Sequence, residues 1–140
     1  MQTDTPARLR LAIARTARRL RQEAGDGLSP SMTAALATIE NHGPLTPSGL
    51  AERERIQRPT VTRVLRRLEE EGLIQRSADE TDGRCTVVVV SPEGRALLKK
   101  LRSRKNAYLA KRLRELPAED VATLERAADV LERLLDGERR

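Results

Sequence analysis

Pairs of Ser or Thr followed by Pro divide this chain into helical segments. Three of these pairs are Ser29-Pro30, Thr46-Pro47 and Ser91-Pro92. A Ser or Thr side chain can accept a hydrogen bond from an exposed amide of the first helical turn, and proline suits that turn because no amide donor is needed there. Gly43 and Gly72 lie where two of the resulting helices would end. The chain is therefore expected to be largely helical.

The spacing of apolar residues agrees with this division. Leu, Val, Ile and Ala recur every three or four residues in most segments, which is the pattern of an amphipathic helix. The predicted helices cover Pro6–Glu23, Pro30 to about Asn41, Ser48–Glu54, Pro59–Glu71, Glu93 to about Glu115, and Ala118–Leu135. Only 1% of the residues are aromatic, so the core must consist of aliphatic side chains, which favours packed helices.

The period changes after Gly72, where two short strands are expected. Leu73–Ser77 and the valine-rich Thr86–Val90 flank a polar stretch that contains the turn-forming pair Asp82-Gly83. A lone valine-rich strand would aggregate, so the two must pair. The predicted fold is mainly α with a small β-hairpin, an α+β arrangement in a single domain of residues 1–140.

The order of these elements predicts a winged helix-turn-helix that binds double-stranded DNA. A short helix, a turn and a longer helix have the proportions of a helix-turn-helix, and a hairpin directly after them is what a wing requires. This lobe is expected to cover residues 29–90. Its longer helix would bury one stripe, formed by Val61, Val64, Leu65 and Leu68.

Basic residues gather at the leading end of that longer helix. Five arginines and no acidic residue lie between Arg55 and Arg67, and Glu69-Glu70-Glu71 follows. Arg can pair with guanine and Gln with adenine, and Thr can contact a thymine methyl or a phosphate. The side chains expected to contact DNA are Gln57, Arg58, Thr60, Thr62, Arg63 and Arg66. The alternative interpretation is a solvated basic face on an ordinary helix.

The charge balance suits an anionic partner without proving one. Lys and Arg number 27 against 21 Asp and Glu, a net charge of +6. The competing hypothesis is a basic module on the same scaffold that binds nucleic acid non-specifically or binds another protein. The variant Arg63→Ala separates these hypotheses. A sequence-specific DNA reader loses discrimination between sequences, whereas a phosphate binder weakens equally on all sequences. A module that binds only protein should show neither effect.

The stretch from Gly43 to Gly94 resembles the multiple antibiotic resistance regulator (MarR) family of winged-helix repressors. Its motifs are Gly43-Pro44-Leu45-Thr46 with Leu50-Ala51-Glu52, Thr60-Val61-Thr62-Arg63 running into Arg67-Leu68-Glu69 and Gly72-Leu73-Ile74, and Asp79 to Arg84 followed by Ser91-Pro92-Glu93-Gly94. Each motif is weak alone, and together they are specific. The flanking helices match the family in order and length, so the resemblance covers nearly the whole chain.

The resemblance implies a homodimer that acts as a ligand-responsive repressor on a near-palindromic operator. Residues 1–25 and 91–140 would form the dimerisation helices, and an intramolecular bundle is the alternative for their apolar stripes. Many relatives respond to small phenolic or other lipophilic acids bound between these helices and the DNA-binding lobe. By region, Arg15, His42 and Tyr108 would line such a pocket here; a surface histidine and a packed tyrosine are the alternatives.

The wing departs from the family pattern. It usually runs Asp-Pro-x-Asp-x-Arg, often with arginine in the third place, and here Glu80 and Thr81 replace the proline and that arginine. Arg84 would enter or brace the minor groove, and Asp79 would hold Arg84 or shape the tip. A purely structural pair of these two residues is the alternative.

A second departure lies in the turn of the helix-turn-helix. Glu54 and Arg55 replace the apolar residue and the glycine that are common in relatives. A different turn geometry is therefore one expectation. Arg55 would be either an added phosphate contact or a solvent-exposed substitution.

Other function classes find little support in the sequence. One Cys and one His provide no metal cluster and no nucleophile–base pair, and no glycine-rich phosphate loop is present, so we expect neither an enzyme nor a cofactor or metal site. Cys85 opens the second strand, away from the N-terminal position used by oxidant-sensing relatives, and is expected to be inert. The absence of a membrane-spanning run and of a secretory signal predicts a cytoplasmic location.

Overall fold

The computed structural model describes residues 4–25, 27–81, 83–84 and 86–138. The elements in chain order are α1 (Thr5–Ala24), α2 (Pro30–His42), α3 (Pro47–Glu54), α4 (Arg58–Glu70), β1 (Ile74–Ala78), β2 (Thr86–Val90), α5 (Pro92–Leu113) and α6 (Ala118–Gly137). The predicted order and the α+β class are confirmed. The fifth helix ends earlier than expected. Before Pro117, the amides of Glu115 and Leu116 donate hydrogen bonds to the carbonyls three residues earlier, not four as in an α-helix.

The Ser-Pro and Thr-Pro pairs begin helices as predicted. The hydroxyls of Ser29, Thr46 and Ser91 each accept a hydrogen bond from the amide three residues later, at 3.2, 3.0 and 3.0 Å. In α1 the same role falls to Asp4, whose carboxylate accepts from an amide at 3.2 Å. Such caps each contribute about 1 kcal/mol, so four helix starts are defined locally.

The hydrophobic core lies beneath the helix-turn-helix and joins it to the hairpin and to α5. The largest fully buried apolar side chains are Leu36, Ile39, Leu50, Leu65, Leu68, Leu98, Val61 and Val88. The stripe predicted for α4 is buried throughout, from Val61 to Leu68. Burying each such aliphatic side chain stabilises the fold by about 1.5–3 kcal/mol, so the core holds α4 in one orientation about its axis.

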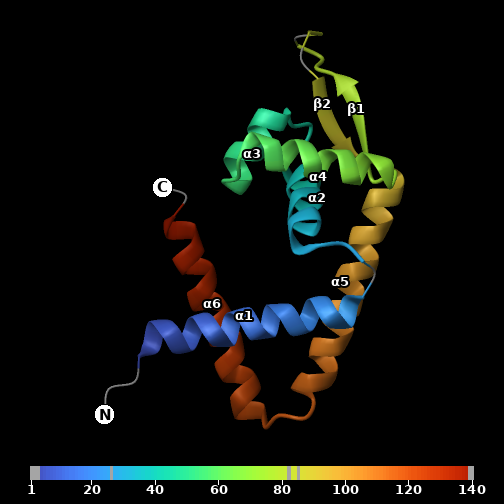
Figure 1. The fold of residues 1–140 in the computed structure, drawn as a ribbon. Coiled ribbons are helices and arrows are strands. Elements are labelled where there is room, and N and C mark those ends of the chain that lie inside the picture. The colour runs from blue at the N-terminus through green and yellow to red at the C-terminus, as the bar shows by residue number, and fades with distance from the viewer. Residues whose placement is uncertain (1–3, 26, 82, 85, 139–140) are drawn as a thin grey trace.

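The hairpin is antiparallel and is anchored at its base. Ile74 pairs with Val90 and Ala78 with Thr86, and an isolated bridge joins Leu45 to Val88 across the other edge of β2. The outer end of the hairpin projects beyond the helices (Figure 1). The turn predicted at Asp82-Gly83 falls partly outside the described residues, since Asp82 is not among them.

Three long helices lie away from this lobe. α5 runs down from the hairpin, α1 crosses it, and α6 turns back from its far end (Figure 1). The Arg104 guanidinium of α5 donates to the carbonyl of Ala24, at the end of α1, at 2.8 Å. Arg102 forms an ion pair of 2.8 Å with Glu40 of α2. The first contact joins α1 to α5 and the second joins the lobe to α5, whereas none of the described α6 residues is buried.

Candidate nucleic-acid interface

The turn between α3 and α4 keeps a left-handed residue although that residue is not glycine. Arg55 has φ 55° and ψ 46°, a conformation that costs an ordinary residue about 1–2 kcal/mol. Its amide and that of Ile56 bond to carbonyls of α3. Glu54, the other departure, accepts a hydrogen bond from the Thr38 hydroxyl of α2. Both unusual residues therefore have a structural context, and the turn is left-handed at Arg55.

The leading end of α4 lies against α3. The Arg58 guanidinium donates to the Ser48 hydroxyl, a contact that sequence reasoning missed because periodicity says nothing of which helices meet. Gln57 occupies the cap position of α4, and its side chain makes no capping bond within the described part of the chain. Its amide group can therefore serve another partner.

The outward face of α4 carries the remaining predicted side chains. Thr62, Arg63 and Arg66 are exposed, and Thr60 is half-buried at one side. The Thr62 hydroxyl donates to the carbonyl of Arg58 at 3.0 Å, while neither Arg63 nor Arg66 has an ion-pair partner among the described residues. The structure thus places Thr62, Arg63 and Arg66 on the exposed face of α4. Arg58 and Thr60 lie toward its two sides, against α3 and α2.

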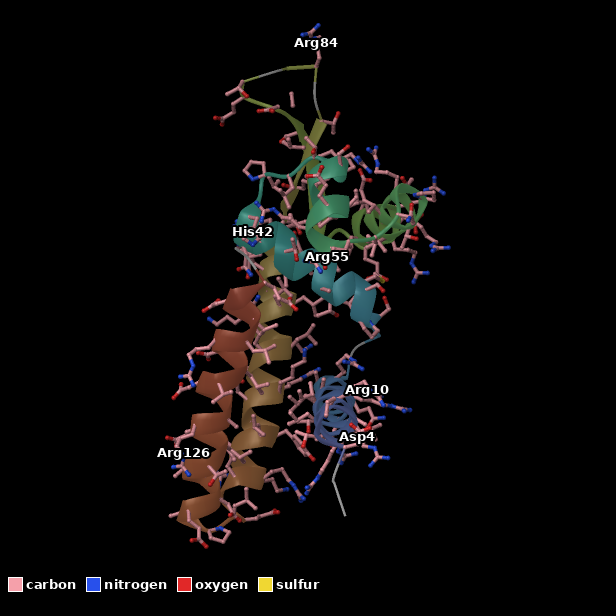
Figure 2. The ribbon with its side chains drawn as sticks, turned by 90° about the vertical axis from the view of Figure 1, so that its left-hand side faces the viewer. Asp4, Arg10, His42, Arg55, Arg84 and Arg126 are labelled. Carbon is pink, nitrogen blue, oxygen red and sulfur yellow. The ribbon has the colours of Figure 1, made fainter. Side chains whose placement is uncertain are left out.

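The wing carries Asp79 and Arg84 at its outer end. A carboxylate oxygen of Asp79 accepts from both the amide and the hydroxyl of Thr81, each at 3.1 Å, so Asp79 shapes the turn at the tip. Arg84 is exposed and extends away from the helices (Figure 2). At the base, Arg76 of β1 pairs with Glu69 of α4 at 3.0 Å, which connects the wing to the helix beside it.

The three residues proposed for a ligand pocket do not all meet. Arg15 and Tyr108 line one cavity of about 290 Å³ between α1 and α5. His42 is exposed at the end of α2 (Figure 2), near the Arg95 end of α5, because neighbouring Gly43 shares a cavity with Arg95. At 1.5 Å per residue, Tyr108 lies about 20 Å further along that helix.

Tyr108 is held by a second arginine of α1. Arg19 donates to the Tyr108 hydroxyl at 3.2 Å and lies 5.5 Å from the ring centroid. This hydrogen bond raises the pKa of Arg19 above its already high ordinary value. When folding raises the pKa of a cation, its stabilising effect is fully present at every pH below its ordinary pKa. Arg19 is therefore protonated, and its contact with Tyr108 persists, at every physiological pH. Tyr108 therefore has a partner within the chain and also lines the cavity with Arg15.

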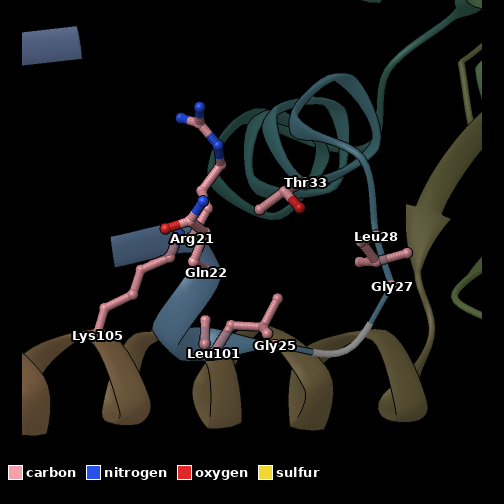
Figure 3. A pocket seen from close by; sticks show the side chains of 9 residues that line it. Arg21, Gln22, Gly25, Gly27, Leu28, Thr33, Leu101 and Lys105 are labelled. Atoms are coloured by element: carbon pink, nitrogen blue, oxygen red, sulfur yellow. The ribbon is translucent and has the colours of Figure 1, made fainter. Parts of the chain in front are cut away.

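A further cavity lies where the helix-turn-helix lobe meets α1 and α5. It has a volume of about 130 Å³ and lies between the end of α1, the segment before α2, and α5. Figure 3 shows Lys105 rising from α5 toward the end of α1 on one side, with Leu28 on the other. Arg21 and Lys105 also line an adjacent cavity of about 280 Å³ against α2. Sequence reasoning missed these two cations because they lie on separate helices.

Among the described residues, no group of three or more His, Cys, Asp or Glu side chains is placed to hold a metal ion. No helix in the described part of the chain is long and apolar enough to cross a membrane. Cys85, expected to be inert, lies outside the described residues.

The helix-turn-helix, the basic outward face of α4 and the hairpin beside it define a winged helix-turn-helix DNA-binding protein. The MarR family model matches residues 28–86. A helix-turn-helix transcriptional regulator of Mycobacterium leprae is 38% identical over 138 residues, which cover 95% of this chain and 96% of the relative. The chain belongs to the MarR family of transcriptional regulators.

Other relatives agree with this assignment. The crystal structure of a transcriptional regulator from Pseudomonas aeruginosa is 34% identical and superposes with a TM-score of 0.85, covering 96% of this chain and 98% of that one. The transcriptional repressor MdtR of Bacillus subtilis is 30% identical over 95 residues, 68% of this chain and 61% of its own length. Regulators of this family bind DNA and act as dimers, and they are not enzymes.

Proposed function

We propose that a homodimer of this chain is a sequence-specific transcriptional repressor that binds a near-palindromic operator. The observation that carries the proposal is the orientation of α4, which buries Val61 to Leu68 and leaves Arg63 and Arg66 exposed without ion-pair partners in the described structure. Exposed guanidinium groups on a rigid helix can form bidentate hydrogen bonds with guanine in a major groove. Their binding would also neutralise phosphate charge.

The neighbouring side chains have complementary roles in this proposal. Gln57 and Thr62 contact bases or phosphates beside the arginines, Thr60 contacts the backbone, and Arg58 leaves Ser48 or brings that hydroxyl with it to the DNA. Arg84 enters the minor groove from the wing, where narrow A·T-rich segments attract a guanidinium. Asp79 acts indirectly, because it shapes the turn that presents Arg84.

Dimerisation follows from apolar surface that a single chain leaves uncovered. On α1, Leu9 and Ile13 are 51% and 47% exposed, and on α6 Leu124 and Leu135 are 50% and 54% exposed. An intramolecular bundle would have buried these stripes, so a second copy is the occupant we propose for them. Two copies related by a two-fold axis would place their α4 helices in successive major grooves about 10 base pairs apart. Repression follows by occlusion.

An acidic effector would act on the spacing of the two lobes. The cavities lined by Arg21 and Lys105 lie where the lobe meets α1 and α5, and the cavity with Arg15 and Tyr108 lies further along α5. A phenolic or lipophilic carboxylate bound there would pair with these cations. It would induce transcription only if it preferred a dimer whose lobe spacing no longer matches DNA, because equal affinity for both states shifts nothing.

The experiment that tests DNA recognition compares two duplexes. We expect the protein to bind the DNA upstream of its own gene at least about a thousandfold more tightly than a random duplex of equal length. Measuring both at two salt concentrations separates the specific contribution from counterion release. Equal, steeply salt-dependent binding to both duplexes would instead support the non-specific basic module, and binding to neither would support a protein-interaction module.

A point variant tests which side chain reads bases. Arg66→Ala should lower operator affinity by about 1–3 kcal/mol and relax discrimination at one base pair. Arg66 is a sharper probe than Arg63, because Arg63 also lines a groove toward α2. Arg126→Ala on α6, an exposed arginine far from α4 (Figure 2), is the matched control. A uniform loss on operator and random DNA would assign Arg66 to the phosphates.

The effector hypothesis has its own test. A panel of phenolic acids is titrated into the protein–operator complex, with Lys105→Ala as the variant that removes a cavity cation. We expect at least one acid to weaken operator binding, and the variant to need a higher concentration of it. Operator affinity that stays unchanged across the panel would count against an acidic effector.

A further inference from the structure

A groove runs along one side of α4, between that helix and the start of α2. It has a volume of about 350 Å³. Its rim carries Ser31 from α2 and Arg63 and Arg67 from α4, which are all exposed, while Met32 and Val64 form a buried floor. The groove therefore combines a fixed apolar base with two guanidinium groups one helical turn apart and a hydroxyl opposite them.

The position of this protein groove beside α4 matters once α4 lies in the major groove of DNA. An α-helix with its side chains is about 10–12 Å across, and the major groove is about 12 Å wide. The two flanks of α4 must then lie against the two phosphate backbones that border the DNA major groove. One flank carries Arg58, which bonds to α3; the other carries Thr60, Arg63 and Arg67, which face α2.

Arg67 on this flank can exchange its ion-pair partner. The ion pair of Arg67 with Glu71 is long, at 3.8 Å, and its side chains are 59% and 45% exposed. Exposed pairs of this kind contribute little to stability. A phosphate offers Arg a shorter, bidentate and charge-assisted contact, so Arg67 should turn toward a phosphate when one is present.

We propose that this groove holds a phosphate of the operator backbone, bound by Arg67 and Ser31 with Arg63 beside them. The inference rests on the proposed DNA binding and adds two residues that the expected contact set lacked. Because a phosphate contact carries no sequence information, the groove fixes the register of α4 on the duplex, while base reading stays with the outward face.

The test uses two variants that act in different ways. Arg67→Ala removes the guanidinium. Ser31→Glu places a negative charge beside the phosphate, and it should not disturb folding because an acidic residue near a helix N-terminus is stabilising. The matched control is Arg112→Ala, which also breaks an exposed arginine ion pair, at 3.1 Å to Glu115, but at the far end of α5.

Affinity for the upstream duplex and for a random duplex is measured across a salt series. Each groove variant should weaken binding about tenfold on both duplexes, leaving their ratio unchanged, while the control should behave as the unaltered protein. For Arg67→Ala the slope of log affinity against log salt should fall by about 0.9 for each lost contact, about 1.8 in a dimer.

Three results would overturn the inference. Unchanged affinity in both groove variants would show that no phosphate lies there. A loss confined to the upstream duplex would assign the groove to base reading. If the unaltered protein bound neither duplex, the proposed function itself would fail, and that outcome is seen before any variant is made.

Discussion

Arg55 shows how a single residue can conflict with local preference and still be accommodated. The turn needs a left-handed residue, the position where glycine is most easily tolerated, yet the chain carries an arginine at φ 55°. The exposed guanidinium is consistent with both alternatives that the sequence leaves open, a phosphate contact and a solvent-exposed substitution. Glu54 is a milder case, because Thr38 supplies a hydrogen bond to its carboxylate.

Replacing Arg55 by glycine should relieve this strain. We expect Arg55→Gly to raise the free energy of unfolding by about 0.5–1 kcal/mol, the left-handed cost less the entropy that glycine adds to the unfolded chain. Urea unfolding at fixed protein concentration measures the change. Arg53→Gly, within α3, should be destabilising by a similar amount. Equal destabilisation by both would show that position 55 carries no backbone strain.

The same variant separates the two interpretations of the Arg55 side chain. If it contacts a phosphate, Arg55→Gly should weaken binding to all duplexes alike and lower the salt slope by about 0.9 for each contact. If it is only solvent-exposed, DNA affinity should be unchanged while the protein is more stable. Equilibrium binding at several salt concentrations decides between them.

At the scale of elements, one junction connects the hairpin to α5. The Ser91 hydroxyl donates to the carbonyl of Gly72 at 2.6 Å and also caps α5. Gly94, in the first turn of α5, lies so close to β1 that an added Cβ would be 2.2 Å from the Leu73 carbonyl oxygen. The contacts of Ser91 and Gly94 therefore fix the orientation of the hairpin relative to α5.

Filling this junction should be costly. Gly94→Ala is expected to lower the free energy of unfolding by about 3 kcal/mol, because the backbone of Leu73 cannot move away as a flexible side chain could. Urea unfolding at fixed concentration measures it. Gly137→Ala is the control, since a Cβ there meets nothing within 4 Å, and it should cause no loss. An equally mild effect at Gly94 would mean that the junction can relax.

For the whole molecule, the distinctive feature is the exposed apolar surface of α1 and α6, which we propose a second copy covers. Leu124 and Leu135 lie at helical spacing on α6 and are half exposed. A charge placed among them would have to be buried unpaired in a dimer interface, which is strongly unfavourable. In a monomer the same charge would face water.

We therefore expect the double variant Leu124→Glu, Leu135→Glu to sediment as a monomer with unchanged helix content. Its affinity for the upstream duplex should fall by at least a hundredfold, because its two lobes no longer bind as a linked pair. Arg133→Glu, which also lowers the net charge by two at an exposed position of the same helix, should leave the dimer intact. A variant that remained dimeric would place the interface elsewhere.

Local features of the sequence predicted most of the elements. Ser and Thr caps, prolines and the apolar stripe of α4 depend on neighbouring residues only, so helix starts and the buried side of α4 could be inferred before any contact was known. The pairing of the hairpin could be inferred because a valine-rich strand left unpaired would aggregate. The regulator class depended on the order of these elements together with the family motifs.

Tertiary structure decided which faces meet. Periodicity gives the direction of a side chain about its own helix, but only packing between distant segments places Arg67 beside Ser31, Arg15 beside Tyr108, or Lys105 beside Arg21. The same packing separates His42 from Arg15 and Tyr108, although the family resemblance assigns all three to one pocket. These relations depend on crossing angles and on the depth at which α1, α2 and α5 pack, which no short stretch of sequence encodes.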